Sequence, residues 1–467
     1  MCETLSISRL RFTDERRPWA RASFFSAALS LLFILVYGGC NALASQRADL
    51  AGYFFSWELR IPFVPSLIVP YLSIDLFFVA SFLLCADKVE LLTHARRIAL
   101  AILIAGMAFL VFPLTAGYPR PDVSGWAGRL FEFLWSFDKP HNLVPSLHVA
   151  LASLLWPVYA RHARGATRWL VHGWFWLIVV SPLLTWQHHL LDVSTGAMLG
   201  QVCLFTFPEG RNRDKFHATG RSCNRAPFGS LAANRSIDCR DRSLTRSTPN
   251  LRVALYYAAG SAALGTPAIA LGSGYWVLMW PASSLALIAV AYARGDSSVF
   301  RKLGGRLPIS TRVVLGPYLL GMFARLLIYR RRGEPWVEAA PRVYCGRLLT
   351  KREALRMRAM GVTGVLDMTA EHAETRAFQK TADLDSDRPM LREIEYMNVP
   401  VLDLTKPSRN QLDIAVPFIA EHARSGGVYV HCALGISRSV TSVAAHTGSQ
   451  QKLPSDQLPR RFGIYGS

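Results

Sequence analysis

Long charge-free runs, separated by short segments rich in arginine, dominate the first half of the chain. Runs of this length cross a bilayer as helices, and six of them lie at 22–46, 61–86, 98–118, 145–160, 169–187 and 193–207, of which the second is interrupted by Asp75. Lysine and arginine concentrate in the N-terminus and after the second, fourth and sixth runs, which the positive-inside tendency places in the cytoplasm. The pattern predicts an all-α, six-span membrane domain over 22–208, preceded by a cytoplasmic N-terminus at 1–21. We interpret the first run as a retained span, because it lacks the small-residue cleavage site of a signal peptide.

The next part of the chain predicts two further spans. Residues 209–251 are polar and basic, as is typical of a cytoplasmic linker. The charge-free run within 252–293 is long enough for a helical hairpin with its turn near Gly272–Gly274. Residues 294–335 are basic again, and the apolar stretch Val313–Tyr329 inside them carries an arginine. We interpret that stretch as an interfacial helix; the alternative is a ninth span, which would export everything after it.

Strand-like and helix-like patterns alternate over 336–467, which predicts a soluble α/β domain in the cytoplasm. The whole chain is therefore expected to be a multi-pass protein of the inner cell membrane. Its 467 residues carry a net charge of +20, yet only 18% are charged and 51% are hydrophobic. Basic loops around apolar spans explain this charge without a nucleic-acid partner. The eight cysteines show no paired or CxxC spacing, which argues against a disulfide scaffold or a zinc module.

Reactive side chains gather at the ends of the third, fourth and fifth runs, which the topology places at one non-cytoplasmic surface. They are Arg120, Ser146, His148, Ser181, His188, His189 and Asp192. His188 and Asp192 are four residues apart, so on a helix they share a face and the carboxylate can orient the imidazole. An arginine can hold an anion, one histidine can attack phosphorus and another can protonate the leaving oxygen, which together suit phosphoryl transfer. The alternative is that these groups only cap helices at the interface.

This set resembles the type-2 phosphatidic acid phosphatase superfamily, most nearly its inositolphosphotransferase-like branch. The resemblance covers about 22–208 and implies a lipid phosphate or lipid-linked substrate, with no metal or other cofactor. It makes His188 the nucleophile, because His189 would leave one residue too few before Asp192. The remaining implied roles are general acid for His148, orienting carboxylate for Asp192, and phosphate binding for Arg120, Ser146 and Ser181.

The chain also departs from this pattern at two positions. Pro113 and Pro182 stand where the family has basic residues. Two phosphate-binding charges are therefore missing or are supplied from elsewhere in the chain.

A second reactive set follows the strand-like run Val428–Val430. Cys432 lies six residues before Arg438, and the loop between them contains Gly435. Backbone N–H groups of such a loop can cradle a phosphate, and a helix that begins near Arg438 favours both a thiolate and an anion. The alternative is a structural cysteine in an ordinary α/β domain.

Two further features complete this set. Arg438 can bind two phosphate oxygens, and Ser439 can hydrogen-bond the sulfur; with Gly435 and Ser437 these are the expected phosphate-binding residues. Asp403 follows the strand-like run Tyr396–Leu402 and is placed to protonate a leaving group.

This second set resembles the dual-specificity branch of the protein tyrosine phosphatases over about 340–445. The resemblance implies Cys432 as nucleophile, Arg438 as phosphate ligand, Asp403 as general acid, and a phosphoprotein or phospholipid substrate in the cytoplasm. Thr350 and Glu353 form a capping box for the first helix of that fold. From about 445 the sequence abandons the apolar helix face expected after the loop, so the tail looks truncated or out of frame.

The two resemblances together are similar to bacterial proteins that join these modules in one chain. The sequence therefore predicts a membrane phosphatase with a histidine-based site outside and a cysteine-based site inside. The alternative is a degenerate protein that binds phosphate ligands or regulates, in which one half, more readily the C-terminal one, is inactive.

Overall fold

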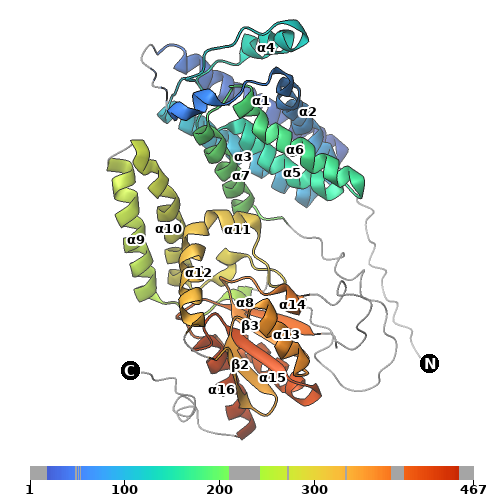
Figure 1. Ribbon diagram of the computed structural model, residues 1–467, viewed down its shortest axis with the longest axis vertical. Coiled ribbons are helices and arrows are strands. Elements are labelled where there is room, and N and C mark those ends of the chain that lie inside the picture. The colour runs from blue at the N-terminus through green and yellow to red at the C-terminus, as the bar shows by residue number, and fades with distance from the viewer. Residues whose placement is uncertain are drawn as a thin grey trace, which may run out of the picture. The chain divides into compact units, whose positions relative to one another are not determined.

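The computed structural model describes residues 18–47, 50, 52, 54–209, 242–270, 273–331, 334–379 and 394–451. Within it the chain divides into two compact units, Met1–Asn224 and Arg225–Ser467. Most of the predicted linker and the tail after 451 lie outside the described residues. The first unit is helical, whereas the second joins further helices to an α/β domain (Figure 1).

Six helices of the first unit overlap the six predicted runs, and a seventh lies between the third and fourth of them. Their bounds are α1 (Trp19–Ala44), α2 (Ile68–Leu84), α3 (Lys88–Val111), α4 (Gly125–Phe137), α5 (Leu147–His162), α6 (Ala166–Leu184) and α7 (Leu190–Thr206). The sequence did not predict α4. It has 13 residues and buries Phe131 and Leu134 while Trp126 and Phe133 stay exposed, so it is too short and too mixed to read as a span.

Helix α3 begins earlier than the apolar run that predicted it. Asp87 caps its N-terminus by accepting a hydrogen bond from the Glu90 backbone N–H at 2.8 Å, which is a common helix start. The basic residues that follow the second run, Lys88, Arg96 and Arg97, therefore lie within the helix; we had expected them in a loop between the second and third spans, which was wrong. The buried Arg97 donates from Nε to the carbonyl of Phe207 at 2.7 Å, because the long side chain can satisfy its charge at the helix end.

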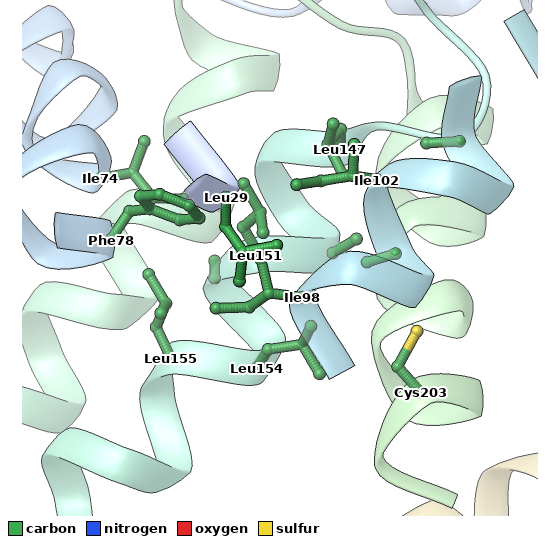
Figure 2. Packing of buried hydrophobic residues seen from close by; sticks show 14 of the residues in the cluster. Leu29, Ile74, Phe78, Ile98, Ile102, Leu147, Leu151, Leu154, Leu155 and Cys203 are labelled. Carbon is green, nitrogen blue, oxygen red and sulfur yellow. The ribbon is translucent and has the colours of Figure 1, made fainter. Parts of the chain in front are cut away.

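The core of the helical unit is built around α5. This helix packs against α2, α3, α6 and α7, and Leu154 and Leu155 are fully buried. Figure 2 shows Leu151 and Leu154 of α5 beside Ile98 of α3. Because apolar side chains fix α5 on all sides, the residues at its N-terminus, where the predicted site begins, have a rigid support.

Within the described residues, four helical segments are long and apolar enough to cross a membrane, judged by length and composition alone. They are Trp19–Ala44, Pro65–Leu84, Lys88–Val111 and Leu251–Ala270, and Leu190–Thr206 is a shorter apolar helix. The predicted count of eight spans therefore remains a proposal.

The second unit begins with helices that precede its sheet. They are α8 (Arg242–Thr245), α9 (Leu251–Ala270), the short turn η4 (Ser273–Leu278), α10 (Met279–Arg294), α11 (Ile309–Val314) and α12 (Gly316–Arg330). Helices α9 and α10 run side by side as the predicted hairpin (Figure 1). The stretch Val313–Tyr329, predicted as an interfacial helix, forms α12, which begins at Gly316 with Pro317 in its first turn, where a missing backbone N–H is tolerated. The short α11 before it was not predicted.

The α/β domain has one five-stranded sheet in the order β1-β2-β5-β3-β4. Its elements are β1 (Trp336–Ala340), β2 (Val343–Arg347), α13 (Lys351–Ala359), β3 (Gly364–Thr369), α14 (Arg376–Gln379), β4 (Glu395–Val401), α15 (Arg409–Ser425), β5 (Val428–Cys432) and α16 (Arg438–Gln451). Strand β5 is central and parallel to both neighbours, whereas β1 pairs antiparallel with β2. All five residues of β5 are buried, as expected for a parallel strand covered on both faces.

A local sequence rule sets the start of α13, whereas tertiary contacts support the C-terminal part of α16. The predicted capping box forms, since Thr350 N–H donates to Glu353 Oε2 at 2.8 Å and Glu353 N–H donates to Thr350 Oγ1 at 3.3 Å. Helix α16 extends past position 445, where the sequence departs from an apolar face. It continues through Gly448 to Gln451 and packs against α15 and β5, because tertiary contacts can override a weak local propensity.

Candidate active sites

The loop after β5 holds the Cys432 sulfur between donors. The Gly435 N–H donates to Cys432 Sγ at 3.2 Å, and the Ser439 hydroxyl donates to it at 3.4 Å. Gly435 has φ +75°, and a Cβ there would lie 2.7 Å from the carbonyl carbon of Gly346. Only glycine fits this left-handed position against β2. The loop therefore needs Gly435 in order to turn its N–H towards the sulfur.

These contacts shift the acidity of the thiol. Burial raises the pKa of Cys432, but the Arg438 charge, the Ser439 hydroxyl and the Gly435 N–H outweigh it and lower the pKa below its ordinary value. A lowered pKa increases the thiolate fraction near neutral pH, and the thiolate is the nucleophilic form. Cys432 therefore has the electrostatics of a reactive cysteine although it is buried.

Arg438 is fully engaged by carboxylates. Its Nη1 and Nη2 lie 2.9 and 2.7 Å from the two carboxylate oxygens of Glu371, and Nη2 is 3.1 Å from Asp403 Oδ1. Both Arg438 and Glu371 are buried, and burial of such a pair demands this bidentate geometry. The sequence reasoning missed Glu371, whose only local signal is that it follows the end of β3.

The predicted acid Asp403 lies beside Arg438 and has a second arginine on its other oxygen. Arg325 of α12 places Nη1 2.5 Å from Asp403 Oδ2. Asp403 thus joins the loop to a helix that precedes the domain in sequence. Its carboxylate faces two guanidinium groups, and no local sequence pattern predicts this arrangement.

The remaining predicted residues of this loop occupy different surroundings. Ser439 is buried against the sulfur, whereas Ser437 is exposed and its carbonyl accepts the Thr441 N–H at 2.8 Å as α16 begins. Cys432, Gly435, Ser439, Arg438 and Asp403 are therefore brought together by the fold, with Ser437 at the rim.

A buried charged cluster lies behind the loop. Asp367, Glu374 and His431 bring one possible metal-ligand atom each to within 4.8 Å of one another. The Lys302 ammonium contacts Asp367 and lies 2.8 Å from Thr369 Oγ1. Lys302 already supplies the positive charge that a cation would bring, so the cluster is explained as an ion-pair network.

The helical unit brings His188 and Asp192 together by a route other than the one predicted. His188 Nδ1 is 3.3 Å from Asp192 Oδ2, but His188 precedes α7, whose N-cap is His189. The expectation that His188 and Asp192 share a helix face was therefore wrong. They meet because Asp192 in the first turn folds back over the cap, accepting the His189 N–H at 2.8 Å.

His189 has separate partners. Its Nδ1 is 3.3 Å from Glu58 Oε2, and its Nε2 accepts the Gly117 N–H at 3.0 Å. Its ring also stacks against Tyr118 at 4.3 Å between centroids. Of the two neighbouring histidines, His188 is thus the one beside Asp192. Glu58, which fixes His189, was not found from the sequence.

The segment that contains Ser146 contacts the segment that contains Asp192 through backbone groups. Ser146 N–H donates to the carbonyl of Asp192 at 2.9 Å, and a Cβ on Gly196 would lie 2.3 Å from the Ser146 carbonyl oxygen. His148 Nε2 and Ser181 Oγ both reach the Ile178 carbonyl, at 3.2 and 2.9 Å. Four residues predicted from the sequence, Ser146, His148, Ser181 and Asp192, therefore lie around the N-terminal end of α5.

Arg120 and His188 line one cavity of about 150 Å³. Arg120 donates from Nη2 to the Asp138 carbonyl at 2.9 Å, and its guanidinium lies 5.2 Å from the Trp135 ring centroid. Lys139 and Asp138 line the same cavity. Among the described residues, the cavity lining does not include Ser146, His148 or Ser181. A phosphate in this cavity would thus meet Arg120, Lys139 and His188 first.

Comparison with known proteins concerns the C-terminal unit. Residues 349–458 match the family model described as the catalytic domain of dual specificity phosphatases. The chain carries a C-terminal dual-specificity phosphatase domain. The match runs beyond 445, where we expected the resemblance to end.

Two human proteins are similar to this domain. The chain is 30% identical over 132 residues to Dual specificity protein phosphatase 12, across 27% of this chain and 35% of that protein. It is 32% identical over 110 residues to Dual specificity protein phosphatase 22, across 23% of this chain and 50% of that protein. The chain thus spans half or less of the length of these curated relatives. Among solved structures, Tk-PTP in the active form is 21% identical, with a TM-score of 0.22 over 27% of this chain and 82% of that one.

Proposed function

We propose that the protein is a membrane-bound phosphoric ester hydrolase with two sites. The Cys432 site of the dual-specificity phosphatase domain hydrolyses phosphomonoesters in the cytoplasm. The His188 site of the helical unit hydrolyses or transfers phosphate from a lipid or lipid-linked substrate on the outer face. The observation that carries the proposal is the Cys432 sulfur held by Gly435 and Ser439 with the charge of Arg438 behind it.

The cysteine reaction proceeds in two steps. The Cys432 thiolate attacks phosphorus while the P–O bond to the leaving group breaks, and Asp403 gives that oxygen a proton. Water then attacks the phosphocysteine, Asp403 takes a proton from the water, and phosphate leaves with the thiolate restored. Loop N–H groups and the N-terminus of α16 hold the phosphoryl oxygens. Arg438 exchanges its contact with Asp403 for a phosphate oxygen, while Glu371 keeps the guanidinium in place.

The helical site offers a histidine relay. Asp192 faces His188 Nδ1, which leaves Nε2 as the nucleophilic atom. Arg120 and Lys139 bind the phosphate in the cavity, and Lys139 replaces one of the charges missing at Pro113 and Pro182. His148 protonates the leaving oxygen after releasing the Ile178 carbonyl. The same phosphohistidine serves transfer to water and transfer to an alcohol acceptor.

The second candidate function is a degenerate phosphate-binding or regulatory membrane protein. Both terminal nitrogens of Arg438 are engaged by carboxylates, which favours an inactive C-terminal half. Such a protein binds a phosphate analogue such as vanadate but releases no phosphate.

Phosphate release by the purified full chain in detergent tests the proposal. The substrates are phosphatidic acid and an aryl phosphate, and the variants are His188→Ala, Cys432→Ser and the double substitution. We expect His188→Ala to remove the phosphatidic acid turnover that survives Cys432→Ser, and Cys432→Ser to abolish aryl phosphate turnover. Full activity in the double variant refutes both assignments, and vanadate binding without any wild-type turnover supports the second candidate.

A further inference from the structure

The general-acid loop of the Cys432 site is tied to the base of the helical hairpin. The Asn250 side chain donates from Nδ2 to the Leu404 carbonyl at 3.1 Å, and Thr248 exchanges two hydrogen bonds of 3.3 Å with the backbone of Lys406. On the other side of the hairpin, the Ser297 hydroxyl donates to the Pro400 carbonyl at 2.9 Å. Asp403 is therefore held between the residues just before α9 and just after α10.

Helix α12 lies against the same place. Tyr257 of α9 contacts Tyr292 of α10 and Tyr318 of α12, with ring centroids 5.5 and 5.6 Å apart. Arg325 of α12 then reaches Asp403 at 2.5 Å. Because α9 is long and apolar enough to cross a membrane, these contacts place the catalytic acid at the foot of a candidate membrane hairpin.

The opposite face of α12 is apolar and exposed. Leu320, Phe323 and Leu327 are 69%, 48% and 44% exposed. At 3.6 residues per turn they lie roughly 140 to 200° around the helix from Arg325. A helix with its side chains is about 10–12 Å across. The exposed apolar stripe and the catalytic acid are thus about one helix diameter apart.

The rim of the site has the same mixed character. Leu404 and Ile436 are 56% and 55% exposed. Two basic residues lie near Leu404: Lys406, two positions further along the loop, is exposed, and Arg325 contacts the neighbouring Asp403. Apolar side chains together with basic ones are typical of a surface that rests on anionic lipid. Exposed apolar side chains are therefore present both on α12 and at the rim of the catalytic loop, with basic side chains near the rim.

We infer that the Cys432 site acts on a phosphomonoester carried by a lipid headgroup in the membrane that the α9–α10 hairpin enters. This rests on the proposed phosphatase function of Cys432. Helix α12 lies in the interface on its apolar stripe, and the headgroup phosphate enters from the membrane side. Arg325 binds the entering phosphate, which releases Asp403 to act as the acid; a phosphoprotein would have to approach the same loop past α12 and the hairpin.

The test uses the full chain in mixed micelles, with His188→Ala in every sample so that the helical site contributes no turnover. The substrates are phosphatidic acid, a phosphotyrosyl peptide and a soluble aryl phosphate. We expect kcat/KM for phosphatidic acid to exceed that for the peptide at least about tenfold, as one charge-assisted contact supplies. The rate of phosphatidic acid hydrolysis should rise with the mole fraction of phosphatidic acid in the micelle surface.

Two variants separate binding at the membrane from chemistry. Phe323→Asp should lower phosphatidic acid turnover by roughly tenfold or more, because a charge on the stripe opposes burial in the interface, and leave aryl phosphate turnover unchanged. Arg325→Ala should lower phosphatidic acid turnover about 10- to 100-fold and aryl phosphate turnover far less, with Arg325→Lys restoring part of the loss. The exposed Arg312→Ala on α11 is the matched control and should change neither.

Three outcomes overturn the inference. A higher kcat/KM for the peptide assigns the site to phosphoproteins. Equal losses on lipid and aryl phosphate in Arg325→Ala make Arg325 a positioning residue for Asp403 alone. Unchanged lipid turnover in Phe323→Asp shows that the stripe does not rest on the membrane. If Cys432→Ser leaves all three substrates unaffected, the proposed function itself fails, which is a distinct result.

Discussion

Replacing Glu371 by glutamine removes one charge from a pair that the fold has buried next to the catalytic loop. Glu371 and Arg438 are 2% and 1% exposed, and their two hydrogen bonds measure 2.9 and 2.7 Å. Removing one partner of such a pair costs about 3–5 kcal/mol because the other charge stays buried. Arg438 keeps Asp403 at 3.1 Å and the Val401 carbonyl at 2.8 Å. We therefore expect Glu371→Gln to lower the free energy of unfolding of the domain by the smaller value of this range, about 3 kcal/mol.

Amide hydrogen exchange measures this loss within the phosphatase domain of the intact chain. A loss of about 3 kcal/mol accelerates exchange through domain opening by roughly two powers of ten, and β5 and α16 should show it. The matched control is Glu395→Gln, which removes a carboxylate 63% exposed and 3.4 Å from His422 Nε2. An exposed pair contributes about 1 kcal/mol or less. Equal acceleration in the two variants would refute the view that the buried pair holds Arg438 in place.

Three further predictions concern other contacts. Ser439→Ala removes a hydrogen bond to the Cys432 sulfur, so the pKa of Cys432 should rise. The pH midpoint for alkylation of Cys432 by iodoacetamide should then move upward, and an unchanged midpoint would contradict the prediction. Burial lowers the pKa of His431, but Glu374 and Asp367 outweigh it and raise the pKa above its ordinary value of 6.5. The stabilisation by protonated His431 is therefore complete below about pH 6.5 and is lost as the pH rises through the raised pKa; thermal unfolding scans should show this pH dependence in the wild type and not in His431→Gln. Gly196→Ala should destabilise the helical unit by about 1–3 kcal/mol, since its Cβ would lie 2.3 Å from a backbone oxygen, whereas Gly173→Ala, with nothing within 4 Å, should not; melting temperatures in detergent that fall equally for both would count against the close packing of α7 on α5.

Elements with a strong local pattern were predictable from the sequence. The buried strand β5, the capping box of α13 and the helix that follows Ser408 all depend on neighbouring residues. Ser408 caps α15: its Oγ accepts a hydrogen bond from the Gln411 N–H at 3.4 Å, and the Gln411 Oε1 accepts one from the Ser408 N–H at 2.8 Å. The coarse order, helices first and an α/β domain after them, follows from such patterns.

Contacts between distant segments were not predictable in this way. Arg325 and Asp403 are 78 positions apart, and Arg438 and Glu371 are 67 apart. No periodicity links such residues, because only the folded backbone brings α12 and the end of β3 to the catalytic loop. The edge strand β1 was missed for a related reason, since its five residues are partly exposed and carry little apolar signal.

The residues of the site also fall into two groups, those that a local pattern predicts and those that only the folded chain brings into place. The sequence was enough to predict the residues that we propose to carry the chemistry, because the strand and the loop after it place Cys432, Gly435 and Ser439 together locally. It did not find the residues that hold them, such as Glu371 behind Arg438 and Glu58 beside His189. Such supporting groups are ordinary carboxylates in the sequence, and only their burial against a positive partner distinguishes them.

The most direct test of the central claim is to trap the covalent intermediate on Cys432. The full chain is mixed with an aryl phosphate, quenched within one turnover and digested, and the peptide that contains Cys432 is weighed by mass spectrometry. We predict a mass increase of one phosphoryl group on this peptide in the wild type and none in Cys432→Ser, with Asp403→Asn slowing the release of the group. Turnover of the substrate with no phosphoryl group on Cys432 at any quench time would contradict the account.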